Sequence, residues 1–295
     1  MDTPSMQQLT YLVALADYGS FSNAADACFV SQPALSAQIK ELENRLGLQL
    51  VERTPRGILL NQQGAKAVDR ARAILRDVKD LVNEAKNNGD ELRGEIHLSA
   101  IPTMAPYLLP SLVQTIKGAY PNVQLHLHED QTKELLQLLR SGKIDIGLLA
   151  LPIEDDTFST AILAFDPFLI ALPENHSLAN TKAPISLNRL SKEKVILLED
   201  GHCLRSQAEN LCIRSNITAS DIQATSLPTL IQMVAAGMGV TLLPQSAASV
   251  EARKGSGVVT RPIRSSEAGR SIGLVWRSSS PVGKYLARVI AKLTK

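Results

Sequence analysis

The chain has 295 residues, of which 44% are hydrophobic and 20% are charged, and its formal net charge at pH 7 is +2. That length accommodates two or three domains with a sizeable core. Three cysteines are too few for a disulfide scaffold, and the near-neutral charge by itself points to no class of partner.

Nothing in the sequence indicates export or membrane insertion. The longest apolar runs are short, such as Val195–Leu198, whereas a membrane-spanning helix needs ~20 apolar residues. Residues 1–10 lack the basic segment and apolar stretch of a secretory signal. We therefore expect a cytoplasmic protein with no membrane partner, in which a cysteine pair is either inert packing or redox chemistry.

Residues 1–60 begin with the pattern of two helices. Apolar residues at helical spacing from Leu9 onward predict the first helix. Ser20 and Ser22 are suited to cap a second, short helix over Asn23–Cys28, because a serine hydroxyl accepts a bond from a free backbone N–H. Cys28 falls on the apolar side of that helix, so we expect it in the core.

A third helix and a hairpin complete this N-terminal domain. Ser31 is suited to cap a helix over Pro33–Arg45, and Gly47 is suited to end it. Two short strands, Gln49–Arg53 and Gly57–Leu60, can then form a wing. The pattern predicts an all-α winged helix–turn–helix.

A long helix follows, from Gln62 to Asn87, with Asn61 as its cap. Its apolar residues recur at spacings of three and four, as in an a/d seam: they are Val68, Ala71, Leu75, Val78, Val82 and Ala85. The seam indicates a linker helix over residues 61–89 that pairs with a second copy, although a helix packed on its own domain would show the same pattern.

From Gly94 onward the pattern alternates between strands and helices. The expected strands are 95–100, 123–129, 144–150, 168–173, 194–199, 240–243 and 271–276, and the expected helices are 104–118, 132–141, one from about 202, and 227–236. This alternation favours an α/β sheet with parallel pairing, in one large domain or two lobes.

The register of particular residues resembles a known family over essentially the whole chain. The matching positions are Phe21, Ala24-Ala25, Val30–Ser36, Gln38-Ile39, Leu42-Glu43, Leu46-Gly47, Leu50, Arg53, Leu60, Gly64, Ser141–Gly147 and Met233–Pro244. The chain resembles a LysR-type transcriptional regulator. The resemblance implies a two-lobed, periplasmic-binding-protein-like sensing domain over residues 90–295, with lobe I at about 90–164 and 270–295 and lobe II at about 165–269.

The resemblance also implies a recognition helix that reads operator DNA. Gln32 and Gln38 can hydrogen-bond bases, and Pro33 and Ala34 can contact thymine methyl groups. The residues suited to phosphates are Ser31, Ser36, Lys40, Arg53 and Arg56, of which Arg56 lies on the wing and could also enter the minor groove. Because the basic residues in this region are few, we expect a homodimer or homotetramer on double-stranded DNA half-sites, with RNA polymerase as a further partner.

One stretch resembles the peroxide-sensing members of that family in particular. It is Leu197–Ala208, followed by Cys212, and residues 101–103, 128–132, 224–227 and 271–277 resemble those members too. The resemblance implies an activator of oxidative-stress genes that responds to hydrogen peroxide, with Cys203 as the peroxidatic and Cys212 as the resolving cysteine of a reversible disulfide. Ser206 departs from the pattern, which usually has Asp at that position.

The residues around Cys203 suit this chemistry. Asp200 can cap a helix whose first turn contains Cys203, so the helix dipole would favour the thiolate, with His202 and Arg205 in support. A thiolate that attacks peroxide becomes a sulfenic acid, which condenses with a second thiol.

Helix geometry makes such a disulfide a conformational switch. Across nine helical residues, Cys203 and Cys212 would lie on opposite faces and ~13 Å apart along the axis. A disulfide needs Cα atoms within about 7 Å, so oxidation requires the segment to unwind, which could change the dimer interface.

Thr103 and Thr132 each fall between the end of a strand and the start of a helix, where open α/β sheets bind ligands. They could orient peroxide beside Cys203, or serve only as helix caps. No cofactor is expected, and His97, His126 and His128 are not expected to bind metal, because no further Cys or His stands at a suitable spacing beside them.

Two other functions compete with the redox regulator. A LysR-type regulator could instead bind a small organic anion between its lobes, with both cysteines as packing residues. An enzyme could use Cys203 as nucleophile and His202 as base, but adjacent residues at a helix start point in different directions.

Overall fold

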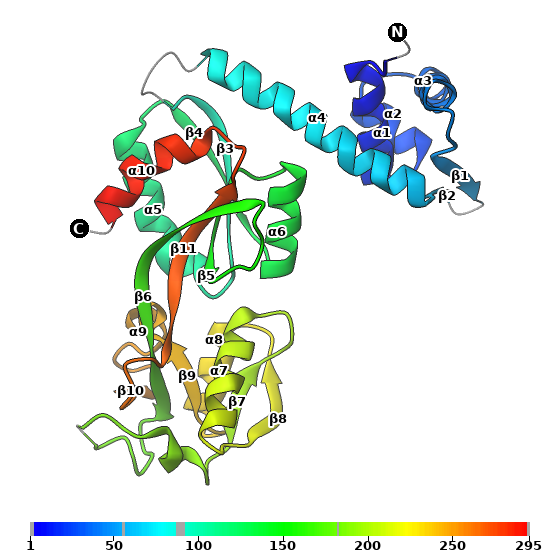
Figure 1. Cartoon of the computed structure of the whole chain (residues 1–295). Coiled ribbons are helices and arrows are strands. Elements are labelled where there is room, and N and C mark those ends of the chain that lie inside the picture. The colour runs from blue at the N-terminus through cyan, green and yellow to red at the C-terminus, as the bar shows by residue number, and fades with distance from the viewer. Residues whose placement is uncertain (1–2, 55–56, 87–91, 182, 294–295) are drawn as a thin grey trace. The chain divides into compact units, whose positions relative to one another are not determined.

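The computed structural model describes residues 3–54, 57–86, 92–181 and 183–293. The chain divides into two compact units, residues 1–88 and 89–295, each of which is described by itself (Figure 1). Within the described residues, no helix is both long and apolar enough to cross a membrane.

The first unit consists of four helices and a two-stranded wing. The helices are α1 (Met6–Tyr18), α2 (Phe21–Ala27), α3 (Gln32–Leu46) and α4 (Gln62–Lys86), and β1 (Val51–Thr54) pairs antiparallel with β2 (Gly57–Leu60). The caps expected at Ser20, Ser31, Gly47 and Asn61 are confirmed, whereas Ser22 does not cap α2, because the helix already begins at Phe21. Ser20 and Ser31 accept bonds from Asn23 N and Ala34 N, Gly47 ends α3 in the left-handed region, and Asn61 Oδ1 accepts from Gly64 N at 2.8 Å.

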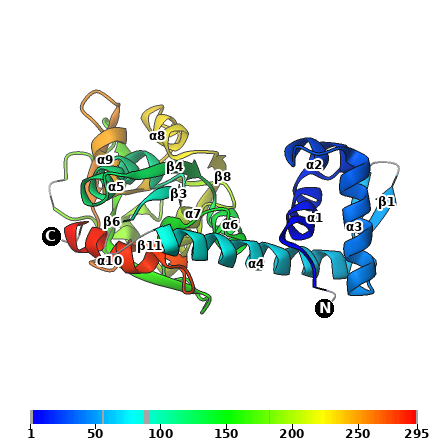
Figure 2. The same cartoon turned by 90° about the horizontal axis from the view of Figure 1, so that it is seen from above.

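The core of this unit includes the first part of α4. Leu35, Ile39 and Leu42 of α3 are buried, and Val68 and Ala71 of α4 pack into the same cluster. Figure 2 shows α1, α2 and α3 gathered at the N-terminal part of α4. The first half of the seam therefore packs on its own domain, and pairing of the second half with another copy stays a prediction.

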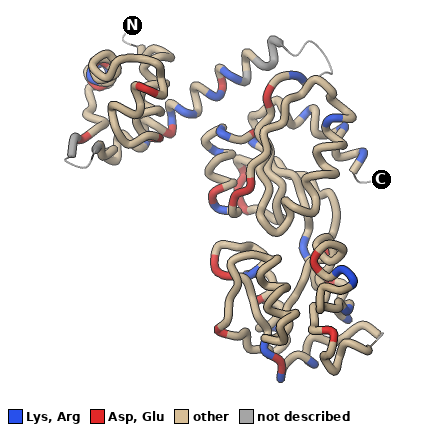
Figure 3. The backbone as a smooth tube through the Cα atoms, turned by 180° about the vertical axis from the view of Figure 1, so that it is seen from behind, with Lys and Arg blue, Asp and Glu red and all other residues tan. Residues whose placement is uncertain are grey.

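The second half of α4 leaves its apolar residues exposed. The side chains of Val78, Leu81 and Val82 are 38%, 65% and 44% exposed. Basic residues accompany this stretch, among them Arg76 and Lys79. Figure 3 shows several Lys and Arg positions, in blue, along α4. A stripe of this kind is what a second helix would cover.

The second unit contains two lobes joined by long strands. We call lobe I the part built on β3 (Gly94–Ala100), α5 (Ala105–Ala119), β4 (Val123–Glu129), α6 (Thr132–Ser141), β5 (Ile146–Leu151) and α10 (Val282–Leu293). Its strands β3, β4 and β5 pair in parallel, as expected.

The joining strands are β6 (Phe158–Pro173) and β11 (Gly269–Arg277), which pair antiparallel with each other and run between the lobes (Figure 1). Two strands of lobe II, β9 (Thr241–Pro244) and β10 (Val258–Pro262), also pair with β6. The strand order is β10-β6-β11-β5-β3-β4, with β9 off this path. The expected parallel pairing thus holds for β3, β4 and β5, whereas β6 and β11 pair antiparallel because a strand that leaves lobe I and the strand that returns to it run in opposite directions.

Lobe II is built on the other end of β6. Its elements are η1 (Leu187–Leu190), β7 (Val195–Leu198), α7 (Cys203–Arg214), β8 (Ala219–Ala224), α8 (Leu227–Ala235), β9 (Thr241–Pro244), α9 (Gln245–Glu251) and β10 (Val258–Pro262). Two apolar clusters fill it, one that includes Phe168 and Ala171 of β6 and one that includes Ile170 and Leu172.

Candidate functional site

Cys203 is the first residue of α7, directly after its N-cap His202, whose side chain makes no capping bond. Asp200 is not the cap, so that expectation is wrong. The chain turns at Gly201 (φ +98°), and the Asp200 carboxylate instead pairs with Arg205 Nε at 2.9 Å. Neither His202 nor Asp200 therefore caps the first turn of α7 through its side chain.

The thiol borders a pocket of about 470 Å³ between α6 and the start of α7. The lining residues are Thr132, Lys133, Leu136, Gln137, Arg140, Gly201, His202, Cys203 and Ser206. Arg140 is held by Asp155 at 2.5 Å. The pocket thus lies between α6 of lobe I and α7 of lobe II, the helix that carries Cys203.

Of the two predicted threonines, Thr132 lies beside Cys203 and Thr103 contacts Arg270, and neither is the N-cap of a helix. The N-caps of α5 and α6 are Met104 and Gln131. Thr132 Oγ1 is buried without a hydrogen bond of normal geometry to any described residue. The Thr103 hydroxyl is also buried and accepts a bond from Arg270 Nη1 at 2.8 Å.

Arg270 is the residue that sequence reasoning missed. Its side chain is 0% exposed, and Nε pairs with Asp166 Oδ2 at 3.1 Å while Nη2 donates to the Thr103 carbonyl at 3.0 Å. Asp166 also accepts bonds from Ser246 N and Oγ. The only sequence signal was an arginine at the start of an otherwise apolar strand, which does not reveal its distant partners.

The environment of Cys203 acts on its pKa in two directions. Burial raises the pKa of the thiol, whereas Arg270, the nearby Thr132 hydroxyl and the backbone N–H groups of Cys203 and Leu204 lower it. Burial is the larger effect, so the net pKa is raised. The expectation that the helix dipole, supported by His202 and Arg205, favours the thiolate is therefore wrong, because desolvation penalises the charged form more strongly.

His202 and Arg205 are turned toward other partners. His202 Nε2 donates to the Thr225 carbonyl at 3.2 Å. Arg205 Nη1 donates to the Leu198 carbonyl at 2.6 Å, in addition to its pair with Asp200. These contacts attach the start of α7 to β7, to the turn before α7 and to the segment after β8. Neither side chain is directed at the Cys203 sulfur by them.

Cys212 lies nine residues further along the same helix and belongs to a different core. Its side chain is 2% exposed within lobe II, whereas Cys203 packs against the lobe I cluster. Burial, followed by the neighbouring Glu209 charge, raises the pKa of Cys212 to about 11. Both thiols are free, as is the half-buried Cys28 that ends α2.

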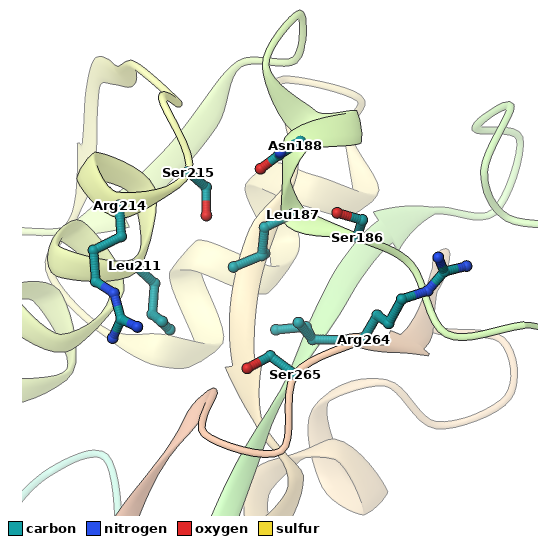
Figure 4. A pocket seen from close by; sticks show the side chains of 9 residues that line it. Ser186, Leu187, Asn188, Leu211, Arg214, Ser215, Arg264 and Ser265 are labelled. Carbon is teal, nitrogen blue, oxygen red and sulfur yellow. The ribbon is translucent and has the colours of Figure 1, made fainter.

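A second, smaller pocket of about 200 Å³ borders the C-terminal end of α7. Its lining residues are Ser186, Leu187, Asn188, Leu211, Arg214, Ser215, Ile263, Arg264 and Ser265. In Figure 4, the Arg264 guanidinium points away from Leu187 and Leu211. Both ends of the helix that carries the two cysteines thus border open space.

The predicted DNA-reading residues divide into two groups on α3. Ser31, Gln32, Pro33, Ala34 and Lys40 are exposed, whereas Ser36 and Gln38 are half-buried. Gln38 Oε1 accepts a bond from Gln8 Nε2 at 3.2 Å. Arg53 lies on β1 with its side chain outside the described part, and Arg56 lies outside the described residues altogether.

Sequence reasoning also missed Phe29, in the turn before α3. Its side chain is 96% exposed, and its φ of +56° is a left-handed conformation that a phenylalanine rarely adopts. Phe29 thus places an exposed apolar ring shortly before the N-terminal turn of α3, where the exposed DNA-reading candidates lie.

Two family models cover nearly the whole chain. The model for bacterial regulatory helix-turn-helix proteins of the lysR family matches residues 6–65, and the LysR substrate binding domain model matches residues 89–295. The chain therefore belongs to the LysR family of DNA-binding transcriptional regulators and not to a class of enzymes, which confirms the family resemblance.

Among its relatives is the DNA-binding transcriptional dual regulator OxyR of Escherichia coli K12, 45% identical over 80% of this chain and 78% of the relative. A cysteine-to-aspartate variant of full-length OxyR from Pseudomonas aeruginosa superposes with a TM-score of 0.81, at 29% identity over 98% of this chain and 94% of that one. A hydrogen-peroxide-bound OxyR mutant from Corynebacterium glutamicum is 35% identical over 99% of this chain and 94% of that one, with a TM-score of 0.66.

Proposed function

We propose that this regulator senses hydrogen peroxide through a reversible Cys203–Cys212 disulfide and in response activates oxidative-stress genes. The observation that carries the proposal is the position of Cys203. It stands at a helix N-terminus, beside the buried Thr132 hydroxyl and the buried Arg270 cation, and it borders a pocket. The similarity to a transcriptional regulator named OxyR and to an OxyR structure with bound hydrogen peroxide supports a peroxide-responsive regulator.

The first step is attack of the Cys203 thiolate on one peroxide oxygen. The S–O bond forms as the O–O bond breaks, and the leaving hydroxide takes up the proton that the thiol released, giving a sulfenic acid and water. Thr132 Oγ1 is the group best placed to bond peroxide, because it is buried beside Cys203 and forms no hydrogen bond of normal geometry to any described residue. Thr103 and Arg270 supply a polar wall and a positive field.

The second step joins the two cysteines. The Cys212 sulfur attacks Cys203 Sγ, the S–S bond forms, and the S–O bond breaks with loss of a second water, so two thiols reduce one peroxide to two waters. Because both residues lie in α7, this step requires the helix to unwind. Unwinding displaces Leu204 and Ala208, which are buried in lobe II.

Unwinding couples oxidation to DNA binding. We infer that the exposed apolar stripe of α4 (Val78, Leu81 and Val82) pairs with a second copy and that the exposed turn of α3 contacts operator half-sites. A rearranged lobe II would change how the sensing domains associate, and with it the spacing of the DNA-binding heads and the contact with RNA polymerase in the cytoplasm.

The test is a thiol count and a footprint on the same samples. Mass spectrometry before and after one equivalent of peroxide is expected to show a Cys203–Cys212 bond, with a changed DNA footprint. Cys203→Ser abolishes both changes, whereas the control Cys28→Ser leaves them intact. Two free thiols at Cys203 and Cys212 after peroxide would disprove the proposal.

The same variant separates the competing function. If the pocket beside Lys133 binds an organic anion that alone controls transcription, Cys203→Ser would still respond to that anion and the wild type would ignore peroxide.

A further inference from the structure

Three histidines and a glutamate from two separate segments meet on one face of lobe I. Strands β3 and β4 pair in parallel with His97 opposite His126. Side chains alternate along a strand, so Glu95 shares the face of His97 and His128 shares the face of His126. The sequence spacing alone did not suggest this cluster, because its two halves are about thirty residues apart.

The imidazole rings lie against one another. The His97 and His126 rings stack with centroids 4.6 Å apart, and those of His97 and His128 with centroids 5.6 Å apart. His97 Nδ1 is 3.3 Å from His128 Nε2, and His126 Nε2 is 4.0 Å from Glu95 Oε1. One ligand atom from each of Glu95, His97 and His126 lies within 4.8 Å of the other two.

These separations match those around a small transition-metal ion. Two nitrogens bound to tetrahedral zinc at about 2.0–2.1 Å stand about 3.4 Å apart, close to the 3.3 Å between His97 and His128. The remaining atoms need only side-chain rotation to converge, and Glu95 and His126 are exposed enough to rotate.

Packing does not account for the cluster. The other face of β3 packs into the core of lobe I, where Ile96 and Leu98 are buried. Glu95, His126 and His128 are exposed, and β4 is the edge strand of its sheet. Polar aromatic rings stacked on an exposed edge bury little apolar surface, so their stabilising contribution to the fold is small.

We propose that Glu95, His97 and His126, with His128 as a further donor, bind one divalent transition cation of the zinc class. Imidazole nitrogens with one carboxylate favour Zn²⁺, Cu²⁺ or Ni²⁺ over Mg²⁺ and Ca²⁺, which prefer all-oxygen sites. The ion would link the edge strand β4 to β3 and so stabilise lobe I. The site contains no cysteine and is independent of the redox proposal.

The test is a zinc titration of the full-length chain in which Cys28, Cys203 and Cys212 are all replaced by serine, because free thiolates would compete for the metal. A competing chromophoric chelator reports the affinity. One zinc ion per chain is expected, together with a rise in Tm on adding zinc. His126→Gln and His97→Gln each weaken the affinity by more than about 100-fold and abolish the rise in Tm.

The matched control is His176→Gln in lobe II, whose imidazole pairs with Glu193 at 3.2 Å and lies outside the cluster. It leaves the zinc affinity unchanged. His126 is exposed, so a metal-free His126→Gln chain with an unaltered Tm shows that folding is intact. Three results would each overturn the proposal. Zinc binding could survive His126→Gln, it could occur in the wild type but not in the cysteine-free chain, or it could be absent from both.

Discussion

Arg205 is expected to set the reduction potential of the Cys203–Cys212 pair without touching either sulfur. Its guanidinium lies in the first turn of α7 and donates to the Leu198 carbonyl at 2.6 Å, in the strand before the helix. This contact depends on α7 being helical. Because disulfide formation unwinds α7, the contact stabilises the reduced form only.

The magnitude follows from the contacts. A hydrogen bond from a charged group contributes about 1.5–3 kcal/mol. The pair with Asp200 adds little, because that carboxylate is 92% exposed. Arg205→Met keeps the apolar stem, removes the contact and so destabilises the reduced form. At about 30 mV per 1.4 kcal/mol for a two-electron couple, the reduction potential becomes more negative by about 30–65 mV.

The assay is equilibration in dithiothreitol or glutathione buffers, followed by trapping of thiols and mass spectrometry. Arg214→Met is the matched control, because Arg214 also lies in α7 but is 70% exposed and forms only a long, exposed ion pair with Glu267, at 3.6 Å. A shift in reduction potential of about 20 mV or less is therefore expected for this control. An Arg205→Met potential equal to that of the control, or shifted to more positive values, would refute the role assigned to this contact.

The remaining predictions concern rate, pH, stability and assembly. Thr132→Val slows sulfenic acid formation about 100-fold in stopped-flow measurements, whereas Thr132→Ser restores most of the rate; equal rates in all three proteins would contradict the peroxide-orienting role. Because burial raises the pKa of Cys203 and only the thiolate attacks, the rate rises about tenfold per pH unit from about pH 6 to 8, and a plateau already below pH 7 would show a lowered pKa instead. Asp166→Asn leaves Arg270 buried without its counter-ion and lowers the free energy of unfolding by about 3–5 kcal/mol in urea titrations, whereas a loss below about 1 kcal/mol would mean that the pair is not buried in solution. Leu81→Glu places a charge in the exposed stripe of α4 and yields monomers in light scattering with weakened operator binding; an unchanged dimer would place the interface elsewhere.

Short-range features of the chain were predictable from the sequence. Ser31, Gly47 and Asn61 begin or end helices as expected, because capping depends on a few neighbouring residues. The common helix of Cys203 and Cys212 also followed from local pattern, and with it the conclusion that the thiols cannot meet while the helix persists. The family was recognisable for the same reason, since its motifs are contiguous.

What depends on burial or on strand register emerged only from the tertiary structure. Arg270 contacts Thr103 and Asp166 across more than a hundred residues of chain, and nothing local to any of the three encodes that contact. The direction of the pKa shift of Cys203 required the extent of its burial, because desolvation opposes the helix terminus that the sequence revealed. His97 and His126 became neighbours through the pairing of β3 with β4, since register joins residues that spacing along the chain keeps apart.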